Sequence, residues 1–185
     1  MNQELIMQGV QLILEGIGED VTREGLQETP RRVAKMYSEL LQGMQEDEQA
    51  HLQKVFQVEN NQLVVESDIT FHSLCEHHML PFWGQVHIGY VPDGRVVGLS
   101  KLARTVEVFA RRLQLQERMT YQIAEALMKH LAPQGVVVMV EAEHMCKNMR
   151  GVKKPGSKTA SLVRKGVFAE NENLVEQFMQ MINRS

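Results

Sequence analysis

The sequence predicts an α+β protein in which a four-stranded antiparallel sheet carries helices on one face, with further helices at the N-terminus. Three observations support this class. The chain opens with helical periodicity, its middle and its later part each hold a pair of strand-like runs, and helical segments separate and follow those pairs. This order differs from the regular alternation of strand and helix in a parallel sheet. Because the edges of such a sheet stay open for pairing, we also expect an oligomer.

Apolar residues that recur every three or four positions mark the helices. The first helix ends near Gly16 and Gly18, and the second begins at Thr29-Pro30, where a capping residue precedes the proline that helices favour in their first turn. The earliest helices form an N-terminal helical region, residues 1–58, and the main domain follows as residues 59–185. The expected helices cover residues 5–17, 29–41, 102–113, 123–131 and 174–182.

Four apolar or alternating runs are typical of strands. The second run stops at Pro92-Asp93-Gly94, and the third follows Pro133-Gln134-Gly135, both of which are sequences typical of turns. These turn sequences mark the end of the second run and the start of the third. The expected strands are residues 62–71, 85–91, 136–142 and 161–168.

Composition limits the classes of partner. The 185 residues include 43% hydrophobic residues, enough for a real core, and a formal net charge of −3 gives no general attraction for nucleic acid or a membrane surface. Any anion must therefore be bound locally. The N-terminus lacks the pattern of a secretion signal, and no run reaches the roughly 18 apolar residues of a membrane span, so we expect a cytoplasmic protein.

Cysteine and histidine residues in two separate segments indicate a metal site. Cys75 and His78 are three residues apart, a spacing that brings both side chains together in one helical turn, which Pro81 keeps short. Cys146 and His144 follow the third expected strand, where residues two apart point to the same side. Two thiolates and one imidazole suit Zn²⁺, and a three-ligand site leaves room for water, as catalytic zinc requires.

Other interpretations of the same residues remain open at this stage. A closed structural zinc site would need a fourth ligand, for which His77, His144 and His72 are candidates. In a reducing compartment Cys75 and Cys146 favour thiols over a disulfide, although a redox-active pair is a further alternative. The zinc deaminases are excluded because the chain contains no Cys-x-x-Cys.

Basic residues open two of the expected helices, where the helix dipole already provides positive charge. Lys101 and Arg104 follow Ser100, a potential cap, and this motif by itself fits a phosphate cradle and a solvated basic patch equally well. The pattern recurs in the helix that begins at Thr29, which carries Arg32 and Lys35 in its first two turns. Two such sites favour a polyanion such as a triphosphate, and Arg150, four residues after Cys146, could add a guanidinium near the metal.

Four motifs in a fixed order make the chain resemble the GTP cyclohydrolase I family. They are Cys75-Glu76-His77-His78, Gly98-Leu99-Ser100-Lys101-Leu102-Ala103-Arg104, Gln114-Leu115-Gln116-Glu117-Arg118 and His144-Met145-Cys146. The similarity extends from about Glu28 to Phe168. It implies a tunnelling-type fold, in which the sheets of several subunits join into a barrel, and a homodecamer of two pentameric rings with active sites at subunit interfaces.

The resemblance also implies the reaction, a hydrolysis of the cyclic amidine in the imidazole ring of guanine. A zinc-dependent enzyme of this family converts GTP and water to 7,8-dihydroneopterin triphosphate and formate, the first step toward tetrahydrofolate or tetrahydrobiopterin. By matching position, Cys75, His78 and Cys146 are implied as zinc ligands, and His77 as the principal proton donor and acceptor. His144 would assist His77.

The substrate contacts are likewise implied by the resemblance. Gln116 and Glu117 would recognise guanine, Ser100 would also help the ribose steps, and a neighbouring subunit would supply Arg32 and Lys35. The residues implied for the triphosphate are Ser100, Lys101, Arg104, Arg150, Arg32 and Lys35.

One segment departs from the family pattern. The family usually carries Thr-x-Thr where this chain has Thr159-Ala160-Ser161, which keeps a hydroxyl at the last position and leaves a local packing or substrate contact open. Three alternative functions share these residues: a zinc-stabilised nucleotide-binding regulator without turnover, a redox protein, and an enzyme that stops after opening the ring.

Overall fold

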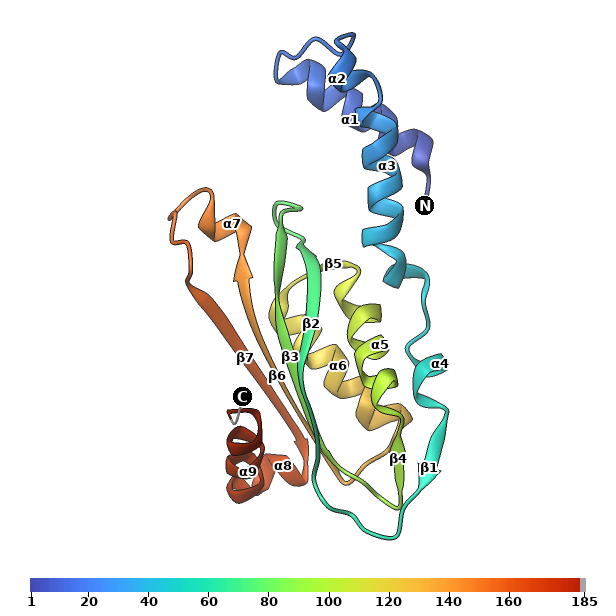
Figure 1. Ribbon diagram of the computed structural model, residues 1–185, viewed down its shortest axis with the longest axis vertical. Helices are drawn as coiled ribbons and strands as arrows, with labels where there is room; N and C mark the ends of the chain where they lie inside the picture. The colour runs from blue at the N-terminus through green and yellow to red at the C-terminus, as the bar shows by residue number, and fades with distance from the viewer. Residues whose placement is uncertain (184–185) are drawn as a thin grey trace. The chain divides into compact units, whose positions relative to one another are not determined.

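The computed structural model describes residues 1–183, and the chain divides into two compact units, Met1–Gln42 and Gly43–Ser185 (Figure 1). The smaller unit holds helices α1 (Gln3–Gly16), α2 (Glu24–Gln27) and α3 (Thr29–Leu40). Helix α1 packs against α3, where Gln3 Nε2 donates a hydrogen bond to Ser38 Oγ at 3.0 Å. Helix α3 begins at Thr29 as predicted, but Glu28 rather than Thr29 occupies the capping position.

The larger unit is built on a five-stranded sheet. Four long antiparallel strands run in the order β2, β3, β6, β7, and the two-residue strand β5 (Leu113–Gln114) adds to β2 in parallel. The predicted four-stranded sheet was therefore one strand short. Strands β1 (Val55–Gln57) and β4 (Arg95–Val97) form a separate antiparallel pair. The long strands are β2 (Val64–Cys75), β3 (Pro81–Val91), β6 (Gly135–His144) and β7 (Lys158–Gly166).

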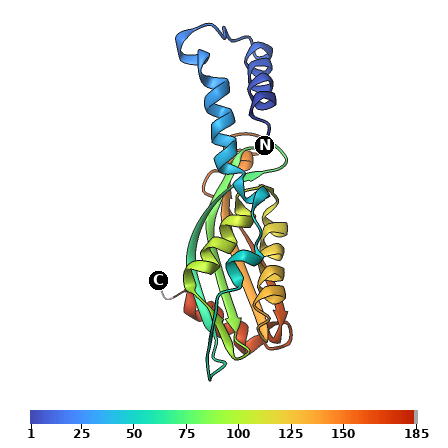
Figure 2. The same ribbon diagram turned by 90° about the vertical axis from the view of Figure 1, so that its right-hand side faces the viewer.

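Helices cover both faces of the sheet. Helices α5 (Leu99–Ala110) and α6 (Gln116–His130) lie side by side on one face (Figure 2), above a core that includes Val136 and Val138. The intervening Val137 points to the opposite face, where it packs with the C-terminal helix α9 (Glu172–Ile182). The prediction of helices on one face was therefore wrong, because strand alternation gives β6 two apolar faces at this end of the sheet.

A close approach at Gly89 positions α9 on that second face. A Cβ at this position of β3 would lie 2.7 Å from the ring of Phe178, so a side chain here would displace the helix. The short helix α8 (Val167–Glu170) precedes α9 and buries Phe168, a residue that the sequence had placed in a strand. Among residues 1–183, no helix combines the length and apolar character that a membrane span requires.

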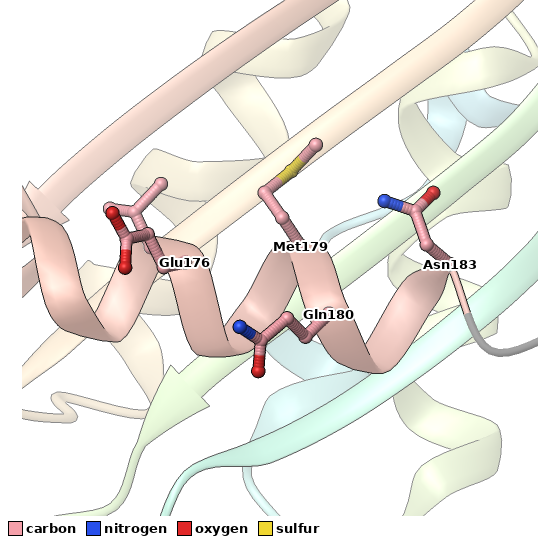
Figure 3. A pocket seen from close by; sticks show the side chains of 5 residues that line it. Glu176, Met179, Gln180 and Asn183 are labelled. Carbon is pink, nitrogen blue, oxygen red and sulfur yellow. The ribbon is translucent and has the colours of Figure 1, made fainter.

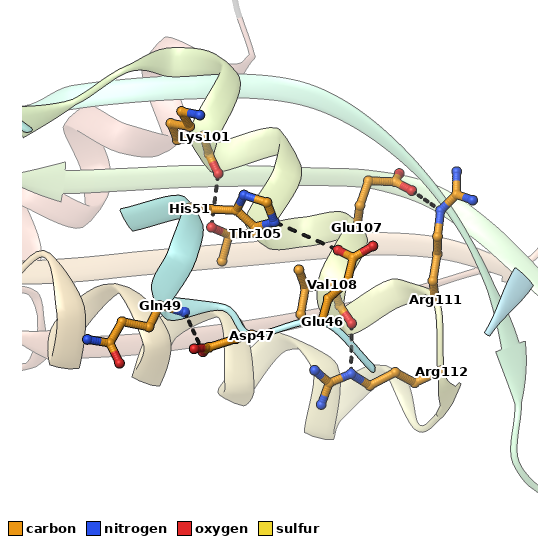
Figure 4. Close-up of polar contacts among 10 residues, drawn as sticks. All are labelled: Glu46, Asp47, Gln49, His51, Lys101, Thr105, Glu107, Val108, Arg111 and Arg112. Carbon is orange, nitrogen blue, oxygen red and sulfur yellow. Dashed lines mark hydrogen bonds and ion pairs between the residues drawn. The ribbon is translucent and has the colours of Figure 1, made fainter. Parts of the chain in front are cut away.

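The segment after the N-terminal helices packs against the main sheet unit. The 3-10 helix η1 (Gln42–Gln45) leads into α4 (Gln49–Leu52), whose Leu52 is fully buried in the core with α5 and α6. Around it, His51 Nε2 lies 3.7 Å from a carboxylate oxygen of Glu46, and Asp47 accepts a hydrogen bond from the Gln49 backbone (Figure 4). The division between compact units lies at Gln42, and it does not test the predicted functional division at residue 58.

Candidate active site

Thiol and imidazole side chains gather in a cavity of about 230 Å³ at one end of the sheet. They come from the end of β2, the turn after it and the junction of β6 with α7 (Met145–Asn148), while the start of α6 adds an amide and a carboxylate. A larger hollow of about 560 Å³ along α9 has only apolar, amide and carboxylate side chains (Figure 3). The smaller cavity is lined by Cys75, His77, Gln114, Leu115, Gln116, Glu117, His144, Cys146, Lys147 and Thr159.

A single turn at the end of β2 presents the first motif. The Met79 N–H donates to the Cys75 carbonyl at 2.8 Å, and the Cys75 N–H donates to the Leu80 carbonyl at 2.9 Å. The expected short helical turn is therefore present, and Met79 closes it with a φ of +55° before β3 begins. Cys75 is buried, whereas His77 is exposed at the tip, so the turn places one buried thiol beside one accessible imidazole.

The two cysteines lie together although 70 residues separate them in the sequence. Both are free thiols, and Cys146 is hydrogen-bonded to Cys75. Burial raises the pKa of Cys146, and the adjoining Cys75 thiol raises it further. Cys146 lies in the first turn of α7 rather than on the strand, so the two-residue strand rule did not apply, yet it still shares the cavity with His144.

His78 faces a different partner from the two thiols. Its Nε2 lies 2.8 Å from Arg150 NH1, and because arginine can only donate, Nε2 is unprotonated and accepts with its lone pair. His78 is absent from the cavity lining, and no group of three side chains among the described residues has the arrangement of a metal site. The structure brings together two of the three predicted ligands, Cys75 and Cys146. The third, His78, lies on the turn that starts at Cys75.

His144 is held firmly at the end of β6. Its ring stacks on Phe82, with centroids 4.7 Å apart and planes within 2°, and its Nε2 lies 2.8 Å from Gln116 Oε1. Burial lowers the pKa of His144, and the positive charge of Lys147 lowers it further, while Glu117 acts in the opposite direction. The imidazole is therefore favoured in its neutral form, which suits a group that accepts a proton.

The two residues predicted to recognise guanine differ in their environments. Glu117 is exposed and lines the cavity, so its carboxylate is open to a ligand. Gln116 is only 2% exposed, and its amide nitrogen lies within hydrogen-bonding distance of Val140, Thr159 and Ser161. In this conformation its side chain already has partners, and a direct contact between Gln116 and guanine stays a prediction.

One further cavity residue, Lys147, was missed by the sequence reasoning. Lys147 follows Cys146 directly, and its Nζ lies 3.4 Å from Thr159 Oγ1 on β7. A lysine beside a proposed metal ligand was an available signal for an anion contact. The position of Thr159 depends on the pairing of β6 with β7, which the sequence alone did not reveal.

The proposed phosphate cradle lies at the far end of α5 from the cavity. Helix α5 begins at Leu99 with Gly98 at the capping position, so the expectation that Ser100 caps it was wrong. The helix then runs toward β5, which pairs with Cys75, and its rise of 1.5 Å per residue puts Ser100 roughly 15 Å from Ala110 (Figure 1). One chain therefore does not bring Lys101 and Arg104 to its own cavity.

The remaining basic residues have separate positions. Arg150 is exposed and adjoins the turn that carries His78, close to the segment that contains Cys146. Arg32 and Lys35 are exposed on α3 of the smaller unit. All three side chains are exposed and can therefore contact an anion.

Fold and site together define an α+β protein with a thiol–imidazole cavity at the end of its sheet. The GTP cyclohydrolase I family profile matches residues 6–183. The curated relatives include three proteins called GTP cyclohydrolase 1: those of Clostridium kluyveri (54% identical, 98% of each chain covered), Clostridium perfringens (55%, 99% of each) and Streptococcus sanguinis (56%, 98% of this chain and 99% of the relative). The chain belongs to the GTP cyclohydrolase I family.

Proposed function

We propose that this protein converts GTP and water to 7,8-dihydroneopterin triphosphate and formate, the first step toward tetrahydrofolate or tetrahydrobiopterin. The observation that carries the proposal is the cavity itself, in which two thiols, two imidazoles and an open carboxylate meet in a chain of this family. We also place the protein in the cytoplasm, as expected from the sequence.

The donor set fits a zinc ion. Cys75 and Cys146 offer two sulfur ligands in contact, and His78 offers an unprotonated Nε2 on the same turn as Cys75. We assign the metal to these three residues, which requires His78 to exchange Arg150 for the metal. When bound, zinc supplies a Lewis acid that lowers the pKa of water toward about 7.

The two cavity histidines move the protons. His77, exposed on the turn, gives a proton to N7 of guanine, which makes C8 more electrophilic toward water. His144, whose lowered pKa favours the neutral imidazole, accepts protons in the same cavity. The imidazole ring of guanine opens to a formamide, and a second hydrolysis releases formate. Ser100 would help the later steps that open the ribose and close the pterin ring.

Charge and polarity orient the substrate. Glu117 accepts the N1–H and N2–H of guanine with one carboxylate, and the neighbouring Gln116 completes this end of the cavity. Arg150 contacts His78, on the turn that follows Cys75 in the same chain. Because Ser100, Lys101 and Arg104 lie at the opposite end of α5, another copy supplies them, and the exposed Arg32 and Lys35 reach the triphosphate from a neighbouring subunit.

Because one copy supplies the cavity and another supplies phosphate-binding residues, the active enzyme would be an oligomer. The outer strand β7 has nine residues and pairs only with β6 in the sheet that the structure describes, so its other edge is open for a further strand. We propose that such edges join the sheets of several copies into the barrel of a tunnelling-type fold. The assembly would be the homodecamer of two pentameric rings expected from the sequence.

The direct test is incubation of the purified protein with GTP. We expect formate and a pterin whose oxidised form fluoresces, in equal amounts, and we expect a zinc chelator to stop both and added zinc to restore both. Release of formate without pterin would identify an enzyme that stops after ring opening. Binding of GTP without either product would identify the regulator without turnover and overturn the proposal.

The contact between the two thiols favours one second candidate, a redox-active pair. Thiol titration and metal analysis of the freshly isolated protein distinguish the two functions. An enzyme with zinc ligands gives one zinc per chain and no disulfide. A redox protein gives a disulfide that reductants open and no stoichiometric metal.

Mixed oligomers test whether two chains build each site. The variants His77→Ala and Lys101→Ala should each be nearly inactive, because each damages every site of its own oligomer. Co-assembled from equal amounts of both chains, they should regain about one quarter of the wild-type formate release, because that share of interfaces joins two intact halves.

The control mixture combines His77→Ala with Cys146→Ala. These two residues line the same cavity of one chain, so every cavity in the mixed oligomer carries one defect and activity should stay absent. Recovery in the control, or none in the first mixture despite proven co-assembly, would contradict the shared site.

A further inference from the structure

Three polar side chains, those of Gln116, Thr120 and Ser161, connect α6 and β7 to His144. The Gln116 amide nitrogen lies 3.0 Å from the carbonyls of Val140 and Thr159 and 3.1 Å from Ser161 Oγ. Backbone carbonyls can only accept hydrogen bonds, so the nitrogen end of the amide must face them. The orientation of the Gln116 amide follows from its surroundings, since a flipped amide would press its oxygen against two carbonyl oxygens.

The two hydroxyls of this network have fixed roles as well. Thr120 Oγ1 donates its single proton to the Gln116 backbone carbonyl at 2.7 Å. Its contact of 2.7 Å with Ser161 Oγ must therefore use the Ser161 proton, which leaves the Ser161 oxygen to accept from Gln116 Nε2. The result is a closed loop of hydrogen bonds in which each hydroxyl proton has one acceptor, while the two amide protons of Gln116 serve three acceptors.

The loop determines which nitrogen of His144 carries a proton. Because the amide nitrogen of Gln116 faces the sheet, Oε1 faces His144, and an amide oxygen can only accept. His144 Nε2 must therefore donate in both the neutral and the charged ring. The remaining nitrogen, Nδ1, makes no hydrogen bond with any residue in the described part of the chain, so its lone pair is open in the neutral ring.

We infer that Gln116, held by Ser161 and Thr120, is a positioning residue that fixes His144 as the Nε2–H tautomer and leaves the lone pair of Nδ1 directed away from this network. The inference rests on the proposed function, in which His144 takes part in proton transfer. It also gives a role to the Thr159-Ala160-Ser161 departure, because the retained hydroxyl contacts Gln116. Threonine at residue 161 would carry an equivalent hydroxyl, so it could make the same contacts with Gln116 and Thr120.

Ser161→Ala tests the network with the smallest change. It removes one acceptor from Gln116 and one donor to Thr120, and we expect kcat to fall about 5- to 10-fold with an unchanged KM for GTP. Ser161→Thr should restore kcat. Gln116→Leu, which removes the acceptor of His144 itself, should lower kcat by about 100-fold. The matched control Ser157→Ala, whose hydroxyl contacts only the Lys154 carbonyl, should leave kcat unchanged.

Ring-nitrogen NMR of histidine-labelled protein measures the tautomer without turnover. The His144 signals, identified by their loss in His144→Ala, should show a protonated Nε2 and a bare Nδ1 in the wild type, and tautomer averaging in Gln116→Leu. A wild-type ring protonated at Nδ1 would overturn the inference. A raised KM with unchanged kcat in Ser161→Ala would also overturn it, because that pattern indicates substrate contact. If GTP gave no formate, the proposed function would fail while NMR still decided the tautomer.

Discussion

Cys146→Ala should lose zinc and formate release together. The remaining thiol and imidazole would be two ligands where a stable zinc site needs at least three, so the metal should wash out during purification. We expect turnover of GTP to fall by about 1,000-fold or more, because the Lewis acid is lost with the metal. The measurements are zinc per chain by atomic absorption and formate per chain under saturating GTP.

Met149→Ala is the matched control for this change. Met149 follows Cys146 on the same segment, is 58% exposed and lies outside the cavity lining, so its truncation should keep both zinc and activity. A Cys146→Ala protein that retained one zinc per chain would exclude Cys146 as a ligand. One that lost zinc but still released formate would separate the metal from the reaction.

The sequence predicted those parts of the site that depend on neighbouring residues. The turn at Cys75 could be foreseen because its spacing and the following proline act locally. The approach of Cys146 to Cys75 depends on a distant register, in which Phe82 of β3 pairs with His144 of β6. The motif order indicated that approach only through the family resemblance, since no local pattern encodes strand register.

Other features could not be predicted, for physical reasons. The apolar stripe of α9 shows that one side of the helix is buried, but not which face of the sheet buries it. No sequence pattern around Gln116 indicates that its side chain is buried, because its burial depends on carbonyls of β6 and β7. Lys101 illustrates a third limit, because a basic helix start predicts an anion contact but not which chain contributes the rest of the site.

His77→Ala should separate metal binding from proton transfer. His77 lines the cavity but is not among the proposed zinc ligands, so the variant should keep one zinc per chain. Without its proton at N7, attack of water on C8 becomes slow, and we expect kcat to fall by about 10²- to 10⁴-fold. Because the side chain is exposed, the free energy of unfolding should change by less than about 0.5 kcal/mol.

His72→Ala provides the comparison that makes this result specific. His72 is also an exposed histidine at the end of β2, but it lies outside the cavity lining, so its loss should leave zinc, stability and kcat unchanged. If His77→Ala lost zinc, the residue would be a metal ligand and the site would have a different ligand set. If both histidine variants kept full turnover, protonation of guanine would have to come from another group, and His144 is the only other imidazole in the cavity lining found among residues 1–183.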